Sequence, residues 1–307
     1  MPQQFIGQSS SSLNNNINTA VILAAGRGER IAGGEEHRSK PLIKLYDISL
    51  IERSVKKLSD KLKINKIYVI TGFKHDELKI HLDKLKRKLT VDLEVVFAKE
   101  WEKGNGASFL SVLNHIKQKQ FYLLMVDHIF NDEFYSTISK SKINNTKCYL
   151  TISKSLSSMH DYNDATRVKI VENKITNIGK SISETNGFDT GFFVLHSEAF
   201  NDVKNLSEKK FLSLSDVMQV LIQKQKLYFI EVAAGSWLDI DTKKDFSNAK
   251  DFLLNFSSSK TNDGPISTYF NRRISKWITS KLVYYPITPN QISVATFLIT
   301  VIASLII

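Results

Sequence analysis

The sequence predicts an α/β fold: a Rossmann-like, mixed and mostly parallel sheet covered by helices, followed by a basic amphipathic helix and a partial transmembrane helix. Three observations support this prediction. Short apolar runs, typical of buried strands, alternate with helical patterns over residues 19–126. A polar, Ser-rich stretch at 257–265 then marks a linker. Finally, residues 292–307 contain no charged side chain.

The first half of the chain predicts strands that are joined by helices. Strands are expected over 19–25, 66–71, 91–98 and 121–126, and helices over 49–62, 75–89 and 107–116. Because a helical pattern separates each strand from the next, these strands should pair in parallel.

The pattern changes beyond about residue 145. Strand-like segments have little helix between them, which indicates a mixed sheet; they cover 147–153, 165–171 and 187–195. Helices are then expected over 214–226 and 243–255, with a strand over 227–232 between them. We therefore place one domain at 19–256, after a disordered polar lead-in at 1–18.

The last segment, residues 266–307, predicts contact with a membrane. Basic and apolar side chains alternate over 266–285, as in an amphipathic helix. The uncharged run that follows is slightly shorter than the ~20 residues that a spanning helix needs, and a buried core helix is the alternative. Since basic residues precede this run, we expect a membrane-associated chain with its main domain in the cytoplasm.

The net charge of +11 over 307 residues narrows the class of partner. The lysines are spread along the chain, which fits phosphorylated substrates as well as a solvated surface. The sequence has no zinc-ligand spacing and no aromatic-basic RNA signature, so no nucleic-acid partner is expected. The single cysteine, Cys148, excludes a disulfide within the chain.

The loop after the first strand is the first candidate for chemistry. Glycine lets backbone N–H groups approach phosphate oxygens, and Arg27 and Lys40 can offset the charge of a triphosphate. An ordinary turn with surface basic residues is the alternative. The expected nucleotide-binding positions here are Leu23, Ala24, Ala25, Gly26, Gly28 and Lys40.

A second candidate segment opens the helix expected at 107. Glycines at the N-terminus of a helix allow a ligand to approach closely, and the helix dipole favours anions. A plain turn with a helix cap is the alternative. The expected binding positions in this segment are Gly104, Asn105, Gly106 and Ser108.

Three aspartates form a candidate metal site. Asp127 directly follows the strand expected at 121–126, at the sheet edge where ligands of such folds gather. Asp239 and Asp241 lie on the same face if their segment is a strand. Because Mg²⁺ prefers carboxylate oxygens, we expect Asp127 and one of this pair to bind Mg²⁺. The other aspartate could then cap the following helix.

These motifs, L-A-A-G-R-G-x-R, K-P-L, G-N-G-A-S and W-x-D-x-D-T, resemble the sugar-phosphate nucleotidyltransferase superfamily in type and order. The resemblance implies that Arg27 and Lys40 contact the phosphates of a nucleoside triphosphate and that the segment from Gly104 holds its base and ribose. It also implies that Lys180 is catalytic and faces the acceptor phosphate, and it favours Asp241 over Asp239 as the metal ligand. The implied acceptor-binding residues are Lys180, Asp189, Thr190 and Gly191; a solvated lysine and a turn are the alternatives.

The C-terminal segment adds a second resemblance. I-T-P-N-Q-I-S at 287–293 resembles the start of the first membrane helix of CDP-alcohol phosphotransferases. Together the motifs resemble the bifunctional family of inositol-1-phosphate cytidylyltransferases and CDP-inositol:inositol-phosphate transferases. This implies CTP and inositol 1-phosphate as substrates, CDP-inositol and pyrophosphate as products, and membrane contact through the C-terminal helix.

The metal-binding motif of the phosphotransferase activity, D-G-x-x-A-R, is absent after Ile292. We therefore expect a truncated phosphotransferase domain without the second activity, which would require a partner that carries the rest of that domain. Two alternatives remain for the whole chain. It is a nucleotidyltransferase for another phosphorylated alcohol or a hexose 1-phosphate, or it is an inactive membrane-tethered scaffold.

Overall fold

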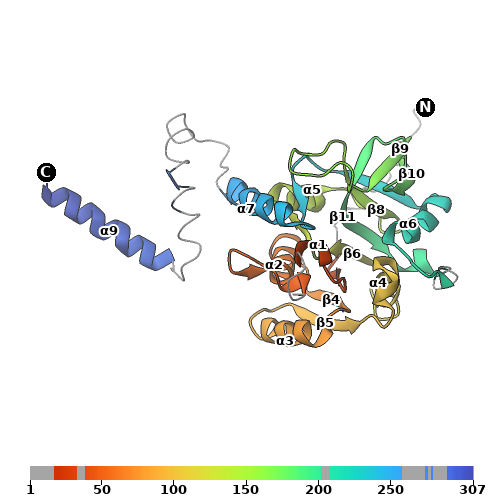
Figure 1. Cartoon of the computed structure of the whole chain (residues 1–307), viewed down its shortest axis with the longest axis horizontal. Coiled ribbons are helices and arrows are strands. Elements are labelled where there is room, and N and C mark those ends of the chain that lie inside the picture. The colour runs from red at the N-terminus through yellow and green to blue at the C-terminus, as the bar shows by residue number, and fades with distance from the viewer. Residues whose placement is uncertain are drawn as a thin grey trace, which may run out of the picture.

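The computed structural model describes residues 17–32, 39–201, 203, 206, 208–257, 274–275, 278 and 289–306. These form an α/β domain, from β1 (Thr19–Ala24) to α7 (Lys243–Ser257), and a separate helix, α9 (Pro289–Ile306) (Figure 1). The predicted lead-in lies outside the described residues apart from residues 17 and 18. The linker predicted at 257–265 also lies outside them apart from Ser257, which ends α7, and so does most of the amphipathic helix predicted at 266–285.

The N-terminal half of the domain is the parallel part of a nine-stranded sheet, with the order β5-β4-β1-β6. The predicted strands are confirmed as β1 (Thr19–Ala24), β4 (Lys66–Thr71), β5 (Asp92–Phe97) and β6 (Gln120–Met125). The connecting helices are α2 (Leu50–Leu62), α3 (His75–Lys86) and α4 (Asn105–Leu110). The helix predicted to reach residue 116 was too long. It ends at Leu110 because the chain tightens there, and the Val112 N–H bonds to the Phe109 carbonyl oxygen at 3.2 Å.

The C-terminal half continues the same sheet, in the order β6-β11-β8-β12-β10-β9. Its strands are β8 (Cys148–Ser153), β9 (Arg167–Val171), β10 (Lys174–Gly179), β11 (Gly187–His196) and β12 (Leu227–Glu231). β12 pairs with β8 in parallel, and the other neighbours pair antiparallel. The mixed sheet predicted for this half is therefore confirmed, but the sheet as a whole is not mostly parallel, because antiparallel pairs predominate here. Glu172 and Asn173, both with positive φ, form a two-residue hairpin between β9 and β10, which fixes antiparallel pairing.

Local sequence explains how α2 covers the sheet. Ser49 caps its N-terminus, since the Ser49 hydroxyl oxygen accepts a hydrogen bond from the Glu52 N–H at 3.3 Å. Apolar residues at helical spacing, including Ile51, Val55 and Leu58, are fully buried. They face the sheet through one of two hydrophobic clusters. This cluster also includes buried residues of α3, α5 (Asp132–Lys140) and α7, while the other lies under α4 and α6 (Leu214–Gln223) on the opposite face.

A small second sheet positions the candidate site and was not predicted. It pairs β7 (His128–Phe130) with β13 (Trp237–Asp239), so that Asp239 lies opposite His128. The helix α5 (Asp132–Lys140) follows β7 and was also missed; Asn131 caps it by accepting the Phe134 N–H at 2.9 Å. Strands of three residues carry too little periodicity to be recognised.

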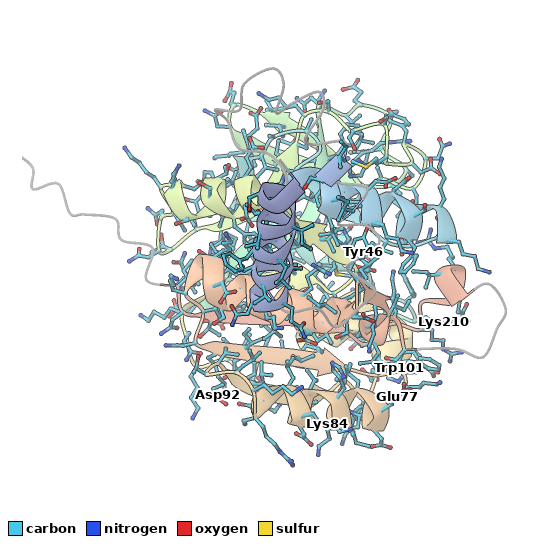
Figure 2. All side chains as sticks on the ribbon, turned by 90° about the vertical axis from the view of Figure 1, so that its left-hand side faces the viewer. Tyr46, Glu77, Lys84, Asp92, Trp101 and Lys210 are labelled. Carbon is cyan, nitrogen blue, oxygen red and sulfur yellow. The ribbon has the colours of Figure 1, made fainter. Side chains whose placement is uncertain are left out.

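The remaining elements are short, except for the helix before the C-terminal segment. They are α1 (Glu29–Ala32), η1 (Lys40–Leu42), β2 (Lys44–Leu45), β3 (Ile48–Ser49), η2 (Trp101–Lys103), η3 (Ser197–Phe200) and α7 (Lys243–Ser257). Charged side chains, Lys84 and Asp92 among them, extend from the surface on several sides of the domain (Figure 2).

The uncharged run at the C-terminus forms α9 (Pro289–Ile306). Polar residues interrupt its apolar surface: Asn290 and Gln291 lie in its first turn, and the hydroxyls of Thr296 and Thr300 donate to carbonyl oxygens one turn earlier, each at 2.9 Å. In the part of the chain that the structure describes, no helix has the length and apolar character needed to span a membrane. The predicted transmembrane helix is thus not found there.

Candidate active site

The loop after β1 brings a buried lysine to the carboxyl end of the sheet. Gly28 has φ +69°, and a Cβ atom on it would lie 2.6 Å from the Cβ of Lys40, so the absence of a side chain lets the two segments pack. Gly26 is different, because nothing lies within 4 Å of the position its Cβ would take. The open side of this loop therefore faces free space at Gly26.

Lys40 joins two of the predicted metal ligands. Its ammonium lies 2.6 Å from Asp127 Oδ2 and 2.6 Å from Asp241 Oδ1, and its side chain is only 8% exposed. Burial by itself would lower the pKa of Lys40, but the two carboxylates outweigh burial and raise it. The pKa of Asp127 is held well below its usual range, since Lys40 and His128 outweigh the opposing effect of burial. Both partners are therefore charged at neutral pH.

His128 fixes the other side of Asp127. Its Nδ1 lies 2.9 Å from Asp127 Oδ1, and its ring stacks on Trp237 with an interplanar angle of 6°. A Cβ on Gly191, which has φ +72°, would lie 2.5 Å from the His128 ring. Gly191 was expected to bind an acceptor; here its lack of a side chain makes room for the imidazole.

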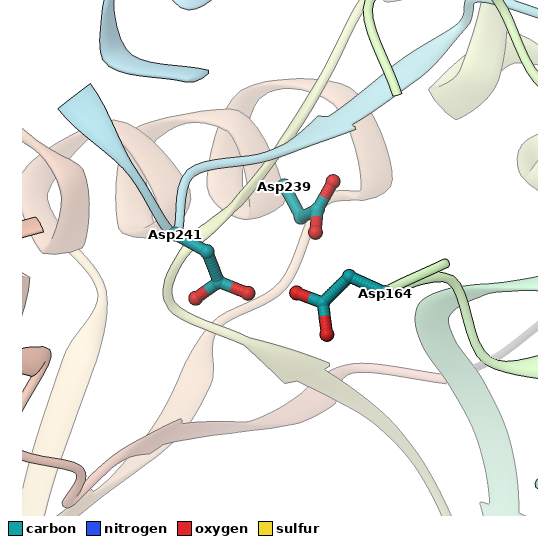
Figure 3. Close-up of side chains that lie close together, drawn as sticks. All are labelled: Asp164, Asp239 and Asp241. Atoms are coloured by element: carbon teal, nitrogen blue, oxygen red, sulfur yellow. The ribbon is translucent and has the colours of Figure 1, made fainter. Parts of the chain in front are cut away.

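A carboxylate cluster lies beside the Lys40 pair. Asp164, Asp239 and Asp241 each place an oxygen within 4.8 Å of the other two, and their side chains converge in Figure 3. Asp164 comes from the connection between β8 and β9 and was not predicted, because no spacing or strand end marks it. It forms ion pairs with Arg30 and Lys180, and Arg30 also bonds Asp241 at 2.7 Å. Burial raises the pKa of Asp239.

Two cavities meet at Asp127. The first, which we call the glycine cavity, has a volume of about 480 Å³ and is lined by Leu23, Ala25, Gly26, Arg27, Glu29, Lys40, Trp101, Glu102, Gly104, Asn105, Ser108, Met125, Val126, Asp127 and Phe211. A shallower hollow of about 340 Å³, the loop hollow, adjoins it and includes Gly28. Ala24 is fully buried in the core and lines neither space.

The second, the acidic cavity, has a volume of about 250 Å³. Asn105, Met125 and Asp127 line both this cavity and the glycine cavity. Its other lining groups include the cations Arg30 and Lys180 and the carboxylates Asp164, Asp189, Asp239 and Asp241. This small cavity thus contains both cationic side chains and carboxylates that can accept hydrogen bonds from hydroxyl groups.

Three of the four predicted acceptor-binding residues line the acidic cavity, and the fourth does not. Lys180, Asp189 and Gly191 line the acidic cavity. Burial raises the pKa of Asp189 to about 6, although the Gly191 N–H donates to its Oδ1 at 2.7 Å. The Thr190 side chain is fully buried instead, and its hydroxyl donates to the Thr151 carbonyl oxygen at 3.1 Å. It points into the sheet and away from the cavity, as alternation along β11 requires.

The glycines of the second segment also serve packing. A Cβ on Gly104 would lie 2.5 Å from the Leu212 carbonyl oxygen, and one on Gly106 would lie 2.4 Å from the Ser213 carbonyl oxygen. Gly104 still lines the glycine cavity with Asn105 and Ser108, whereas Gly106 is buried and lines neither cavity. The absence of side chains at these glycines therefore also allows the backbone just before α6 to pack against them.

Neither aspartate of the W-x-D-x-D-T segment caps α7. The cap comes from Thr242, whose hydroxyl oxygen accepts the Asp245 N–H at 3.2 Å, while Asp245 accepts the Thr242 N–H at 2.8 Å. Both aspartates are thus left to face the acidic cavity. Asp241, rather than Asp239, shares the Lys40 ammonium with Asp127.

Comparison with known proteins identifies the sequence pattern. A family model described as nucleotidyl transferase matches residues 19–255. A bifunctional IPC transferase and DIPP synthase from Aquifex aeolicus is 33% identical, with coverage of 94% of this chain and 64% of the relative. The protein of the same description from Thermococcus kodakarensis is 31% identical, with coverage of 93% and 62%. The chain thus spans about three fifths of the length of these relatives.

A solved structure shares the fold. The inositol-1-phosphate CTP transferase from T. maritima has a TM-score of 0.71 at 23% identity, with coverage of 81% of this chain and all of that one. A putative glucose-1-phosphate thymidylyltransferase from Bacillus anthracis gives a TM-score of 0.65 at 19% identity.

Proposed function

The chain belongs to the nucleotidyl transferase family, and from that premise we propose that this enzyme transfers CMP from CTP to inositol 1-phosphate with Mg²⁺, forming CDP-inositol and pyrophosphate. The A. aeolicus relative, described as an IPC transferase and DIPP synthase, and the T. maritima structure, an inositol-1-phosphate CTP transferase, support this choice of substrates. The proposal concerns the domain that ends with α7.

The observation that carries the proposal is the meeting of two unlike cavities at Asp127. The glycine cavity has a volume of about 480 Å³, and its lining includes Lys40 and Arg27, whose charges suit phosphates. The acidic cavity offers Arg30 and Lys180 to a phosphate and carboxylates to ring hydroxyls. A polyol phosphate placed there would have its phosphate beside the α-phosphate of the nucleotide.

The reaction needs no protein nucleophile. A phosphate monoester carries close to two negative charges at neutral pH, so its oxygen can attack the α-phosphorus as the bond to pyrophosphate breaks. Catalysis then consists of positioning and charge stabilisation. Lys40 and Arg27 would stabilise the triphosphate, and Lys180 and Arg30 would exchange Asp164 for the acceptor phosphate.

The carboxylates fit a divalent cation. Asp127 and Asp241 already converge on one cation, the Lys40 ammonium, and Asp164 and Asp239 lie beside them. Hard oxygen donors of this kind suit Mg²⁺. We propose that Asp127 and Asp241 hold it, with Asp239 within reach. When bound, Mg²⁺ would supply charge neutralisation at the phosphates.

The test is pyrophosphate release by the full chain with Mg²⁺, each of the four NTPs, and inositol 1-phosphate, hexose 1-phosphates or phosphocholine. We expect release with CTP and inositol 1-phosphate, and its loss in Asp127→Asn but not in Asp83→Asn, which changes an exposed aspartate of α3. Release with a different pair would replace the substrates and keep the reaction. A folded protein that releases no pyrophosphate with any pair of NTP and acceptor would refute the proposal.

A further inference from the structure

We propose that Phe211 is the base-stacking residue of the glycine cavity and so determines affinity for the nucleotide. The inference rests on the proposed function, because it assumes that a nucleotide occupies this cavity. Phe211 lies on the connection from β11 to α6, outside every motif that the sequence analysis identified. It nevertheless lines the cavity together with the loop after β1.

Hydrogen bonds hold this connection against the start of α4. The Leu212 N–H donates to the Lys103 carbonyl oxygen at 2.7 Å, and the Gly106 N–H donates to the Leu212 carbonyl oxygen at 3.0 Å. The Leu214 N–H donates to Asn105 Oδ1 at 2.7 Å. The backbone on both sides of Gly104 and at Leu212 is thereby joined, which fixes Phe211 at the edge of the cavity.

The ring itself is free to receive a ligand. The Phe211 side chain is 64% exposed, and among the described residues no aromatic ring packs against it. One edge approaches Gly104, where a Cβ would lie 3.1 Å from Phe211 Cε2. A large, exposed aromatic side chain at the edge of a cavity is unfavourable in water until a ligand covers it.

The other aromatic side chain of the cavity is already engaged. The Trp101 ring lies 5.1 Å from the Arg27 guanidinium and 6.1 Å from the Phe73 ring. It also covers Gly72, whose Cβ would lie 2.4 Å from Trp101 Cγ. Phe211 is therefore the ring of this cavity that can offer a free face.

Charge places the base at the Phe211 end. The glycine cavity shares Gly26, Arg27, Glu29, Lys40 and Asp127 with the loop hollow, and this shared part holds the cations that suit phosphates. Toward Phe211 the lining becomes neutral, apart from Glu102, whose carboxylate is paired with Arg27 at 2.5 Å. A neutral, aromatic-edged end suits a base, because every base has a π face that stacks on aromatic rings.

The experiment measures the dissociation constant of CTP by calorimetry for the chain of 307 residues as the wild type, Phe211→Ala and Phe97→Ala. Phe97 is a matched control, since it is 46% exposed and lies outside the glycine cavity. We expect Phe211→Ala to weaken CTP binding about 10-fold or more, with Phe97→Ala unchanged. The KM for inositol 1-phosphate should stay the same in both variants.

A second variant separates stacking from a general loss of structure. Phe211→Trp should bind CTP within about twofold of the wild type, and its added fluorescence should change on CTP binding. Equal CTP affinity in wild type and Phe211→Ala would overturn the inference while leaving the proposed function intact. Because binding requires no turnover, a wild type without transferase activity would refute the proposed function and still allow this measurement.

Discussion

At the scale of single residues, Lys40 has the most demanding position in the site. It is buried between Asp127 and Asp241, and removal of its charge leaves these two carboxylates facing each other without the cation between them. We expect Lys40→Met to lower kcat/KM at least about 100-fold, because a preorganised charge at a reacting phosphate contributes on that order. Pyrophosphate release measures this effect. Lys44→Met is the control, and equal losses in both variants would contradict the assignment.

The ionised side chain of Asp189 should lower the free energy of unfolding at neutral pH. Its pKa is about 6 in the fold, where burial raises it, and about 3.9 in the unfolded chain. As pH rises from about 4 to 6, the unfolded state therefore loses its proton first, so the free energy of unfolding falls over this window and stays lower above it.

The variant Asp189→Asn removes this penalty and keeps an oxygen for the Gly191 N–H. We expect it to raise the free energy of unfolding by about 2 kcal/mol at pH 7.5, a figure reduced for the partial exposure of the side chain, and to leave it unchanged at pH 3.5. Urea unfolding at both pH values gives the comparison. The same gain at both values would show that ionisation is not the cause.

The sequence identified most of the charged residues of the site, but it did not show which of them form ion pairs with one another. Arg27, Lys40, Asp127 and Asp241 were found because they follow strands or a glycine loop. Asp164 was missed because it lies in an irregular connection and reaches Arg30 and Lys180 only through the tertiary fold. Thr190 was assigned to ligand binding from the family resemblance, and the sequence did not reveal that its face of β11 meets the core.

At the scale of elements, the two glycine segments should respond differently to the same substitution. Gly104 has φ +115°, and an added Cβ would meet the Leu212 carbonyl oxygen at 2.5 Å, whereas a Cβ on Gly26 would meet nothing within 4 Å. We expect Gly104→Ala to lower the free energy of unfolding by about 1–3 kcal/mol and Gly26→Ala to change it by about 0.5 kcal/mol or less.

Although Gly26→Ala should hardly change stability, we expect it to affect ligand binding. Since its Cβ would project into the space where phosphates are proposed to lie, Gly26→Ala should weaken CTP binding although it unfolds like the wild type. Thermal unfolding and CTP titration of the two variants are the measurements. A Gly26→Ala protein with wild-type affinity for CTP would exclude close backbone contact at this loop.

Long, periodic elements were predicted well, and short ones were not. The buried strands β1, β4 and β6 and the helix α2 have clear apolar patterns. The pair β7 and β13 has three residues in each strand, and its pairing joins segments more than 100 residues apart in the sequence. This small sheet sets the position of Asp127 against Asp239, so the geometry of the site depends on a feature that local sequence does not encode.

At the scale of the whole molecule, the site joins the two halves of the domain. Lys40 and Asp127 come from the parallel half, and Asp164, Lys180 and Asp241 come from the mixed half; ion pairs connect them across the sheet edge. The sequence predicted the first half as a unit and a change of pattern after residue 145. It predicted a mixed sheet within one domain at 19–256 but did not reveal the strand order, in which β11 pairs with β6 and so joins the two halves.

Because both halves contribute to the site, ligand binding should stabilise the domain as a unit. CTP with Mg²⁺ at about 100 times its dissociation constant should add about 2.7 kcal/mol to the free energy of unfolding, which corresponds to a rise in Tm of roughly 5–10 °C for a domain of this size. Addition of EDTA should remove most of the rise if carboxylates such as Asp127 and Asp241 bind the metal with the triphosphate.

The measurement is thermal unfolding of the full chain with each NTP, with and without Mg²⁺. Asp127→Asn is the control variant, in which the metal-dependent part of the shift in Tm should disappear. If no NTP shifts Tm, no nucleotide binds at the junction of the two halves. A shift that is indifferent to EDTA would keep the nucleotide site and remove the metal from it.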